Sequence, residues 1–187
     1  MGMLVVVAIF VLILVVVPVL WGIGVYNALV AISVRVKEAW AQIDTVLQRR
    51  FDLIPNLVET VKGYAGHEKE TLTRVVEARA KATSTTVMAD KVKATGEFES
   101  ALARLLVTVE NYPQLKADAN FRALQDELAN TENQIAGMRS LYNEAVKQNN
   151  TAIRVFPNNI IAGMFRFGEA AYFEVGEDAK KAPQVKF

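Results

Sequence analysis

The side chains best suited to metal-ion chemistry are His67 and Glu68, which are adjacent in the sequence. A zinc hydrolase motif of the form HExxH needs a second histidine one helical turn later, because both imidazoles must reach one ion from the same helix face. Thr71 stands at that position, and the chain contains one histidine. We therefore predict no metal site here, and we expect His67 to face solvent or to lie at the end of a helical bundle.

The other polar side chains also fall short of a catalytic set. Glu127 and Glu132 have the character of di-iron ligands in helical bundles, but such sites need Glu-x-x-His pairs that a single histidine cannot supply. No general base is evident for a serine nucleophile, and no glycine-rich loop is followed by the lysine that binds phosphate. The sequence predicts no catalytic, cofactor-binding or metal-binding residue and no enzymatic activity. A hydrolase with an unconventional site is the weakest alternative.

Two charged side chains, Arg50 and Glu68, fall on otherwise apolar helix stripes. Arg79 falls on the same stripe as Glu68, and the sequence leaves open a buried or half-buried ion pair between Arg50 and Glu68. Such a pair more often fixes how helices pack than takes part in catalysis.

The elements that would position these residues begin with an apolar segment. Residues 1–34 carry no charged side chain, and Met3–Gly24 is almost entirely apolar. A stretch of about 20 apolar residues crosses a bilayer as a helix. No basic residue precedes the run, and the run is too long for a cleaved signal peptide. We predict a transmembrane anchor at residues 1–25.

The orientation follows from the basic residues behind this segment, which are Arg35, Lys37, Arg49 and Arg50. Because positive charge is retained on the cytoplasmic side, the larger part of the chain is expected in the cytoplasm and the N-terminus outside. The predicted location is the bacterial inner membrane, with a single pass. The formal net charge of +1 gives no basic footprint for nucleic acid, so no nucleic-acid partner is predicted.

Apolar residues at steps of three and four positions predict long helices in the remainder. We expect a first helix that continues from the anchor to Ile54 and ends at Pro55-Asn56, and a second that ends at residues 83–86. A third is expected at 90–111 and a fourth at 118–156. The stripe of the fourth helix is typical of a bundle or coiled coil, with Thr131 and Asn149 as polar positions that set the register. Its members are Phe121, Leu124, Leu128, Thr131, Ile135, Met138, Tyr142, Ala145, Asn149, Ala152 and Phe156. The predicted fold class is all-α: a transmembrane helix that continues into a long-helix antiparallel four-helix-type bundle over residues 26–157.

Two places form a candidate interaction surface. The first contains Arg49, Arg50, Phe51 and Asp52. We favour a helix-hairpin corner there, with the arginines complementing a helix C-terminus, over a docking surface far from the membrane.

The second place is the aromatic-rich tail at residues 158–187, with Ile160, Ile161, Met164, Phe165 and Phe167. At about 1.5 Å per residue the fourth helix is roughly 58 Å long and the part of the first helix beyond the anchor roughly 42 Å. The chain therefore returns to membrane level. The tail either folds over the open end of the bundle, or it lies in the membrane interface or packs on a neighbouring subunit.

Several stretches of the sequence resemble the LemA family. They are Ala39-Trp40-Ala41-Gln42-Ile43-Asp44, residues 48–58, Tyr64-Ala65-Gly66-His67-Glu68, and residues 112–116, 131–136, 139–143, 156–162 and 183–187. The resemblance covers nearly the whole chain; departures are Phe51, where tyrosine is common, and the apolar stretch 31–34. It implies a bacterial single-pass membrane protein with an antiparallel bundle and no established enzymatic activity. Some family members are associated with magnetosome membranes.

Taken together, these observations predict a membrane-anchored scaffold or interaction protein. We expect it to form a homo-oligomer that organises the lipid bilayer or partner proteins, one of which is an unidentified membrane protein. The alternative is a sensor that transmits the state of the membrane through the first helix.

Overall fold

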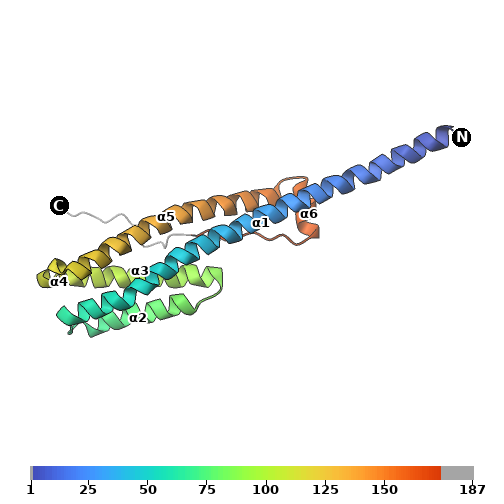
Figure 1. The fold of residues 1–187 in the computed structure, drawn as a ribbon. Helices are drawn as coiled ribbons and strands as arrows, with labels where there is room; N and C mark the ends of the chain where they lie inside the picture. The colour runs from blue at the N-terminus through green and yellow to red at the C-terminus, as the bar shows by residue number, and fades with distance from the viewer. Residues whose placement is uncertain (1, 174–187) are drawn as a thin grey trace, which may run out of the picture. The chain divides into compact units, whose positions relative to one another are not determined.

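The computed structural model describes residues 2–173 and contains helices and no strands in that range. The helices are α1 (Gly2–Tyr64), α2 (Lys69–Ser84), α3 (Met88–Val109), α4 (Pro113–Ala117), α5 (Ala119–Arg154) and α6 (Asn158–Met164), as Figure 1 shows. The predicted all-α class is confirmed. Residues 174–187 of the predicted tail lie outside the described residues.

The described residues divide into two compact units. The first combines residues up to 40 with residues 141–172, and the second combines residues 41–140 with Phe173. Helices α1 and α5 therefore contribute to both units, and α2, α3 and α4 belong to the second. Within the second unit, α2 and α3 form an antiparallel hairpin (Figure 1).

The turn between α2 and α3 is where the sequence predicted a break. The hydroxyls of Thr83, Ser84 and Thr85 donate to main-chain carbonyls three or four residues earlier, at distances of 2.7–3.1 Å. The carbonyl of Lys81, which accepts from Ser84 and Thr85, is one of the last four that a helix end leaves without a helical partner. The hydroxyl-rich stretch thus ends α2 at Ser84, and α3 begins at Met88.

The predicted end of the first helix at Pro55-Asn56 is wrong, because α1 continues through Pro55 to Tyr64. A proline inside a helix lacks the N–H that would bond the carbonyl four residues earlier, here that of Phe51. In this structure Arg79 of α2 supplies the missing donor, and its Nε lies 2.7 Å from the Phe51 carbonyl oxygen. The apolar side chains Phe51, Ile54 and Leu57 around the proline are fully buried. Their burial, at about 1.5–3 kcal/mol each, outweighs a proline cost of about 3 kcal/mol.

The predicted fourth helix at 118–156 corresponds to α5, which is slightly shorter, and the short helix α4 before it was not predicted. Residues 113–117 form α4, and α5 starts after Asp118, whose carboxylate accepts the backbone N–H of Phe121 at 2.9 Å as an N-cap. The inward stripe of α5 is confirmed from Phe121 to Ala152. It does not extend to Phe156, whose side chain is 76% exposed beyond the last residue of α5.

The core of the second unit is aromatic at its centre. The rings of Phe51 and Phe98 meet edge to face with centroids 5.1 Å apart, and both side chains are fully buried. Around them lie other fully buried residues of this unit: Ile43, Leu47, Ile54, Leu57, Leu102, Leu105, Leu115, Phe121 and Ile135.

The first unit has its own smaller core. Leu29 of α1, Ile153 of α5, and Ile161 and Ala162 of α6 form one buried cluster, with Val25, Ala152 and Phe167 packed against it. Further along the same two helices, the rings of Trp40 and Tyr142 lie 5.7 Å apart. Because higher residue numbers in α1 meet lower numbers in α5, the two helices are antiparallel in this unit.

Candidate functional site

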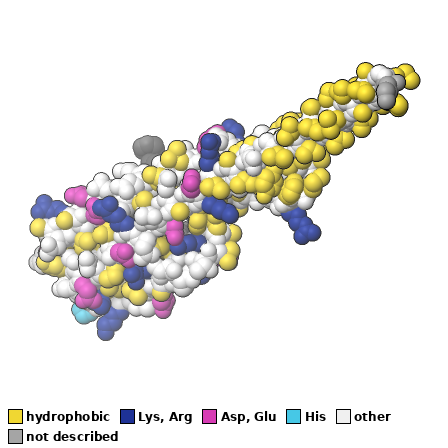
Figure 2. Space-filling view, turned by 45° about the vertical axis from the view of Figure 1, so that its right-hand side comes forward, with side chains coloured by type: hydrophobic (Ala, Val, Ile, Leu, Met, Phe, Trp, Pro, Cys, Tyr) yellow, Lys and Arg dark blue, Asp and Glu magenta, His cyan; other side chains and the backbone are white. Residues whose placement is uncertain are grey.

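The first part of α1 is exposed and apolar. The segment is long and apolar enough to cross a membrane, and none of it is buried within the protein. Figure 2 shows hydrophobic side chains covering its visible face. A helix segment that is apolar all round and is not buried in the described chain has the surface that a lipid environment requires.

Helix α6 packs against the end of this apolar segment. Its Ile161 is buried, and the Cδ1 atom of Ile161 would lie 3.5 Å from a Cβ atom placed on Gly22. That separation is ordinary van der Waals contact, so Gly22 lies where α6 meets α1 and an alanine would also fit there. The structure thus places α6 beside residues that the sequence assigned to the membrane anchor.

Between α1 and α6 lies an open apolar groove of about 430 Å³. It is lined by Pro18, Val19, Gly22, Ile23 and Tyr26 of α1 and by Ile161, Met164 and Phe165 at α6. We call this hollow the α1–α6 groove. The hydroxyl of Tyr26 is the one polar side-chain group in that set. An open groove of this composition accepts apolar chains and contains no group that could carry out acid–base chemistry.

An aromatic cluster closes one side of the groove. The ring of Tyr26 lies 4.7 Å from that of Phe165 and 5.7 Å from that of Phe167. Phe167 is half-buried, whereas Met164 and Phe165 are 67% and 54% exposed. The structure therefore places Phe165 and Phe167, two residues of the predicted tail surface, against one ring, that of Tyr26. The sequence could have indicated Tyr26 only through its position in residues 1–34, which carry no charged side chain.

The remaining tail residues of the predicted interaction surface divide between core and surface. Ile161 belongs to the core of the first unit, and Ile160 is exposed beside it in sequence. The exposed members of the tail surface are thus Ile160, Met164 and Phe165.

The segment after α6 is held against α5 by side-chain amides. Asn150 bonds both main-chain groups of Ala170, with Nδ2 donating to its carbonyl and Oδ1 accepting from its N–H, each at 2.9 Å. Asn149 donates to the Gly168 carbonyl at 3.2 Å, so this predicted register residue holds the returning chain. The hydroxyl of Tyr142 donates to the carbonyl of Ala171 at 2.8 Å.

These contacts recognise the peptide backbone and not particular side chains. Burial raises the pKa of the Tyr142 hydroxyl, so it stays a donor. An ion pair between Arg154 and Glu169 at 2.5 Å adds a surface contact. Sequence reasoning did not find this attachment, because the extended segment has no periodic pattern.

In the second unit, charged side chains enter the bundle. The guanidinium of Arg50 pairs with Glu132 and lies 3.6 Å from Glu99, while Arg139 also pairs with Glu99. Arg139 lies over the ring of Phe173, with 4.7 Å from its Cζ to the ring centroid. Two arginines and two glutamates balance in charge. We call them the Arg–Glu cluster.

This cluster corrects two sequence interpretations. The predicted helix corner at residues 49–52 is wrong, because those residues lie inside α1. Phe51 is fully buried and Arg50 nearly so, so neither belongs to an exposed interaction surface; Arg49 and Asp52 are exposed. Arg50 is a buried ion-pair partner as was considered, but its partners are Glu132 and Glu99.

The glutamates first considered for chemistry, Glu68, Glu127 and Glu132, have structural partners. Glu68 accepts the hydroxyl of Tyr112 at 3.0 Å, and that bond raises the pKa of Tyr112. His67 is exposed in the loop after α1. Glu127 pairs with Arg49. Within residues 2–173 no group of three or more histidine or acidic side chains is arranged to hold a metal ion.

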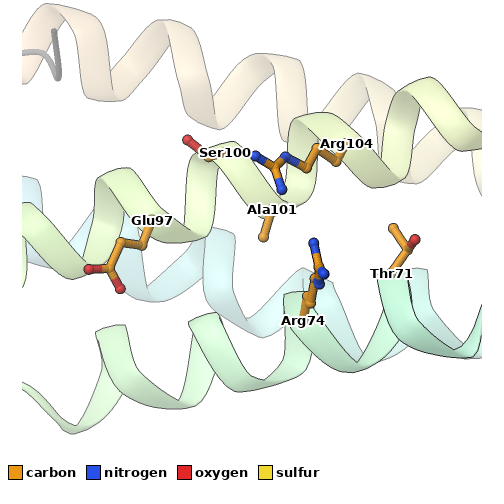
Figure 3. A pocket seen from close by; sticks show the side chains of 6 residues that line it. All are labelled: Thr71, Arg74, Glu97, Ser100, Ala101 and Arg104. Atoms are coloured by element: carbon orange, nitrogen blue, oxygen red, sulfur yellow. The ribbon is translucent and has the colours of Figure 1, made fainter. Parts of the chain in front are cut away.

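A further hollow, of about 280 Å³, lies between α2 and α3. Figure 3 shows Arg74 pointing from α2 toward α3 and the guanidinium of Arg104 lying near Ser100, with the small side chain of Ala101 between the two guanidinium groups. Arg74 is paired with Glu70, and the acidic member of the hollow, Glu97, is paired with Lys81, both at 2.5 Å. The hollow has excess positive charge that attracts anions, but its Glu97 is engaged elsewhere and not positioned as a base for a hydroxyl.

Comparison with known proteins places these features in a family. The profile of the LemA family matches residues 39–187. The chain is similar to magnetosome protein MamQ 2 of Paramagnetospirillum magneticum, with 26% identity over 80% of this chain and 64% of that protein. It is also similar to protein LemA of Metamycoplasma hominis, with 24% identity over 83% of this chain and 71% of that protein. The match to MamQ 2 thus spans slightly less than two thirds of its length. The family match confirms the resemblance, and together with the apolar segment of α1 it supports a membrane-associated helical protein.

Proposed function

Because the chain belongs to the LemA family, we propose that it is a single-pass membrane protein that works as a non-catalytic scaffold. The observation that carries the proposal is the position of α6, which lies against the end of the apolar segment and exposes Met164 and Phe165 there. The protein then meets the bilayer at two places, the α1 span and the α6 surface. Each large apolar side chain that enters lipid contributes about 1.5–3 kcal/mol. A second contact makes the angle of attachment defined and not free.

Three glutamates of the second unit support the non-catalytic part of this proposal. Glu99 and Glu132 are engaged by arginines, and Glu97 by Lys81. A hydrolase needs a carboxylate or imidazole directed at a nucleophile. The carboxylates of the Arg–Glu cluster instead bind helices to each other.

We further propose that the second unit lies in the cytoplasm, with the N-terminus across the inner membrane. Arg35, Lys37 and Arg166 support this orientation, because they are exposed in the first unit near the apolar segment in sequence or in the fold. Arg49 and Arg50 support it less than the sequence suggested, since both form ion pairs with glutamates.

Self-association completes the proposed scaffold. The exposed apolar residues of α6 and of α1 are available to a second copy. Relatives named magnetosome protein support a role of this chain at a membrane. A homo-oligomer with membrane contacts in each copy would organise lipid or other membrane proteins. Light scattering of the detergent-solubilised full chain should show more than one copy per particle. A strict monomer would contradict the oligomeric part.

A depth measurement tests the two-contact arrangement. With Trp21 and Trp40 replaced by Phe, a single tryptophan at Met164 should be quenched by lipids brominated on their acyl chains. The matched control is a tryptophan at Leu141, an exposed apolar residue of α5 in the same unit, which should be quenched much less. Equal quenching at both positions would contradict the α6 contact. Release of the full chain by alkaline carbonate would contradict the anchor itself.

One observation favours the alternative of a membrane sensor. Helix α1 continues without interruption from the apolar segment into the core of the second unit. A continuous helix can transmit a change of tilt or rotation. Hydrogen exchange of residues 41–64 should then differ between thin and thick bilayers. A flexible Ser33→Gly, Val34→Gly variant should abolish that difference without unfolding the protein, and an unchanged exchange pattern in the native chain would exclude sensing by this route.

A further inference from the structure

Arg166 has an unusual backbone conformation. Its φ is 57°, in the left-handed region, and it is the one non-glycine residue with positive φ in the described chain. The main-chain N–H of Phe167 bonds the carbonyl of Ala162 at 2.9 Å, and that of Arg166 bonds the carbonyl of Gly163 at 3.3 Å. These are the two bonds of a Schellman motif, which ends α6 and turns the chain back.

Glycine is the residue that this position favours, because a side chain in the left-handed region is strained. The chain has a glycine two residues later, at Gly168, but places an arginine where the turn needs positive φ. The motif itself does not require the side chain of Arg166, which is exposed. Strain of this kind is typical of positions that hold a group for binding.

Within residues 2–173 the charge of Arg166 has no acidic partner. The nearest acidic residue in the sequence, Glu169, is paired with Arg154 at 2.5 Å. No carboxylate pairs with Arg166 within residues 2–173. An exposed guanidinium with five donors is suited to bind a phosphate through two parallel hydrogen bonds.

The neighbour of this cation is the α1–α6 groove. Phe165, directly before Arg166, lines the groove, and the ring of Phe167, directly after it, packs on Tyr26, another lining residue. The groove is open, holds about 430 Å³, and is lined by apolar and aromatic side chains. Arg166 is therefore next in the chain to one residue that lines the groove and to another that packs on a lining residue. A cation and an apolar groove on a membrane segment are the two parts of a phospholipid site.

We propose that the α1–α6 groove binds one acyl chain of an anionic phospholipid, and that Arg166 binds its phosphate. This inference rests on the proposed membrane anchoring. The occupant is a lipid and not a free anion, because the groove offers apolar walls and a single described cation. The site would select phosphatidylglycerol over phosphatidylcholine, since the cationic choline group of the latter opposes Arg166.

The test uses the full chain in nanodiscs that contain phosphatidylglycerol and phosphatidylcholine in equal amounts. Native mass spectrometry of the released protein measures which lipid remains bound. We expect the native chain to retain phosphatidylglycerol about tenfold in preference, because the choline group carries the same charge as Arg166 and the glycerol group carries none. Arg166→Gly should abolish the preference, although it relieves backbone strain and raises the thermal stability. That combination separates a binding role from a structural one.

Three further arms complete the experiment. Arg154→Gln is the matched control, since it removes a neighbouring arginine that is paired with Glu169, and it should keep the preference. Val19→Trp fills the groove and should reduce retention of both lipids. Inorganic phosphate should not displace the lipid; displacement would identify a free-anion site and overturn the proposal.

The result for Arg166→Gly decides the proposal independently of the anchor. Retained preference for phosphatidylglycerol in this variant overturns the lipid site, even if the protein resists carbonate extraction. Release by carbonate overturns the anchoring on which the site rests. The two failures are therefore distinguishable.

Discussion

The two units of the protein differ in where they place charged and apolar side chains. The second unit takes charged groups into the bundle and pairs them, as Arg50 is with Glu132 and Glu99. The first unit leaves apolar groups outside, on α1 and at Met164 and Phe165. Buried charges need partners within the chain, whereas exposed apolar surface needs a partner outside it. The first unit is therefore where lipid or protein partners are expected.

Two departures from local backbone rules show the same contrast. Pro55 deprives the Phe51 carbonyl of its helical donor, and Arg79 of the same unit replaces it. Arg166 adopts a strained conformation in the first unit, and no bond from its side chain within the described residues offsets it. The departure at Pro55 is structural, because a bond from Arg79 compensates it. The strain at Arg166 has no such bond within the described residues, and we take it to indicate a ligand.

The largest expected effect tests whether Phe51 is core or surface. Phe51→Ala should lower the free energy of unfolding by about 3–5 kcal/mol, because a buried ring is replaced by a cavity. Asp52→Ala, at the neighbouring exposed position, should change it by less than about 0.5 kcal/mol. Urea unfolding of the full chain in detergent, followed by circular dichroism, measures both. Similar losses of unfolding free energy in the two variants would support the interpretation of Phe51 as a surface residue.

The Arg–Glu cluster gives the next effect. Arg50→Met removes the cation that Glu132 and Glu99 share, and we expect a loss of about 2 kcal/mol in the free energy of unfolding. Arg49→Met is the matched control, because the side chain of Arg49 is 59% exposed in its pair with Glu127. That variant should cost at most about 1 kcal/mol. Equal losses would mean that the cluster contributes no more than a surface pair.

The compensation at Pro55 predicts a coupling between two helices. Arg79→Met should cost about 1–2 kcal/mol in the native background, because the Phe51 carbonyl loses its donor. In a Pro55→Ala background the new N–H at position 55 can bond that carbonyl, so the same change should cost less by about 0.5–1 kcal/mol. A double-mutant cycle in urea measures this difference. Strict additivity would show that Arg79 does not replace the missing bond.

In the first unit, Asn150→Ala should release the segment after α6. The two bonds to Ala170 contribute about 1 kcal/mol each, so the amide of Ala170 should exchange its hydrogen roughly ten times or more faster. Gln148→Ala, exposed on the same helix, is the control and should leave that exchange unchanged. The global free energy of unfolding should fall little, because the second unit is untouched.

The smallest effect concerns pH. The backbone N–H of Phe121 and the hydroxyl of Tyr64, 3.0 Å away, lower the pKa of Asp118. A lowered pKa stabilises the folded state above the unfolded value of about 3.9, and that contribution disappears as the pH falls through the folded value. Tyr64→Phe should therefore raise the pKa of Asp118 in NMR titration, but not to its unfolded value. Tyr112→Phe should leave the Asp118 titration unaffected.

The same bond acts in the opposite direction on its donor. Asp118 raises the pKa of Tyr64 through the hydrogen bond and its negative charge. The contribution of Tyr64 to stability is thus present below its unfolded pKa of about 10 and is lost as the pH rises through the higher folded value.

Periodicity in the sequence predicted the inward positions well. The stripe of α5 from Phe121 to Ala152 and the hydroxyl-rich break after α2 are confirmed, because both depend on residues near each other in the chain. The end of the first helix was misplaced at Pro55. The sequence shows the cost of a proline, but it does not show that Arg79, distant in the chain, would offset that cost.

The candidate site was predicted only in part for the same reason. The tail aromatics stand out in the sequence, but Tyr26 and the backbone contacts of Asn149 and Asn150 depend on how distant segments meet. The strain at Arg166 is a backbone property that no residue pattern reports.

By itself, the sequence determined that this protein is helical, that one segment is apolar enough for a membrane, and which face of each long helix turns inward. These properties follow from local composition and from the 3.6-residue period of the helix. The tertiary structure alone decided which glutamates neutralise Arg50, where α6 packs, and that Phe165, next to Arg166 in the chain, lines a groove. Those features arise where residues far apart in the chain come within contact distance, and free energies of packing, not local pattern, select those contacts.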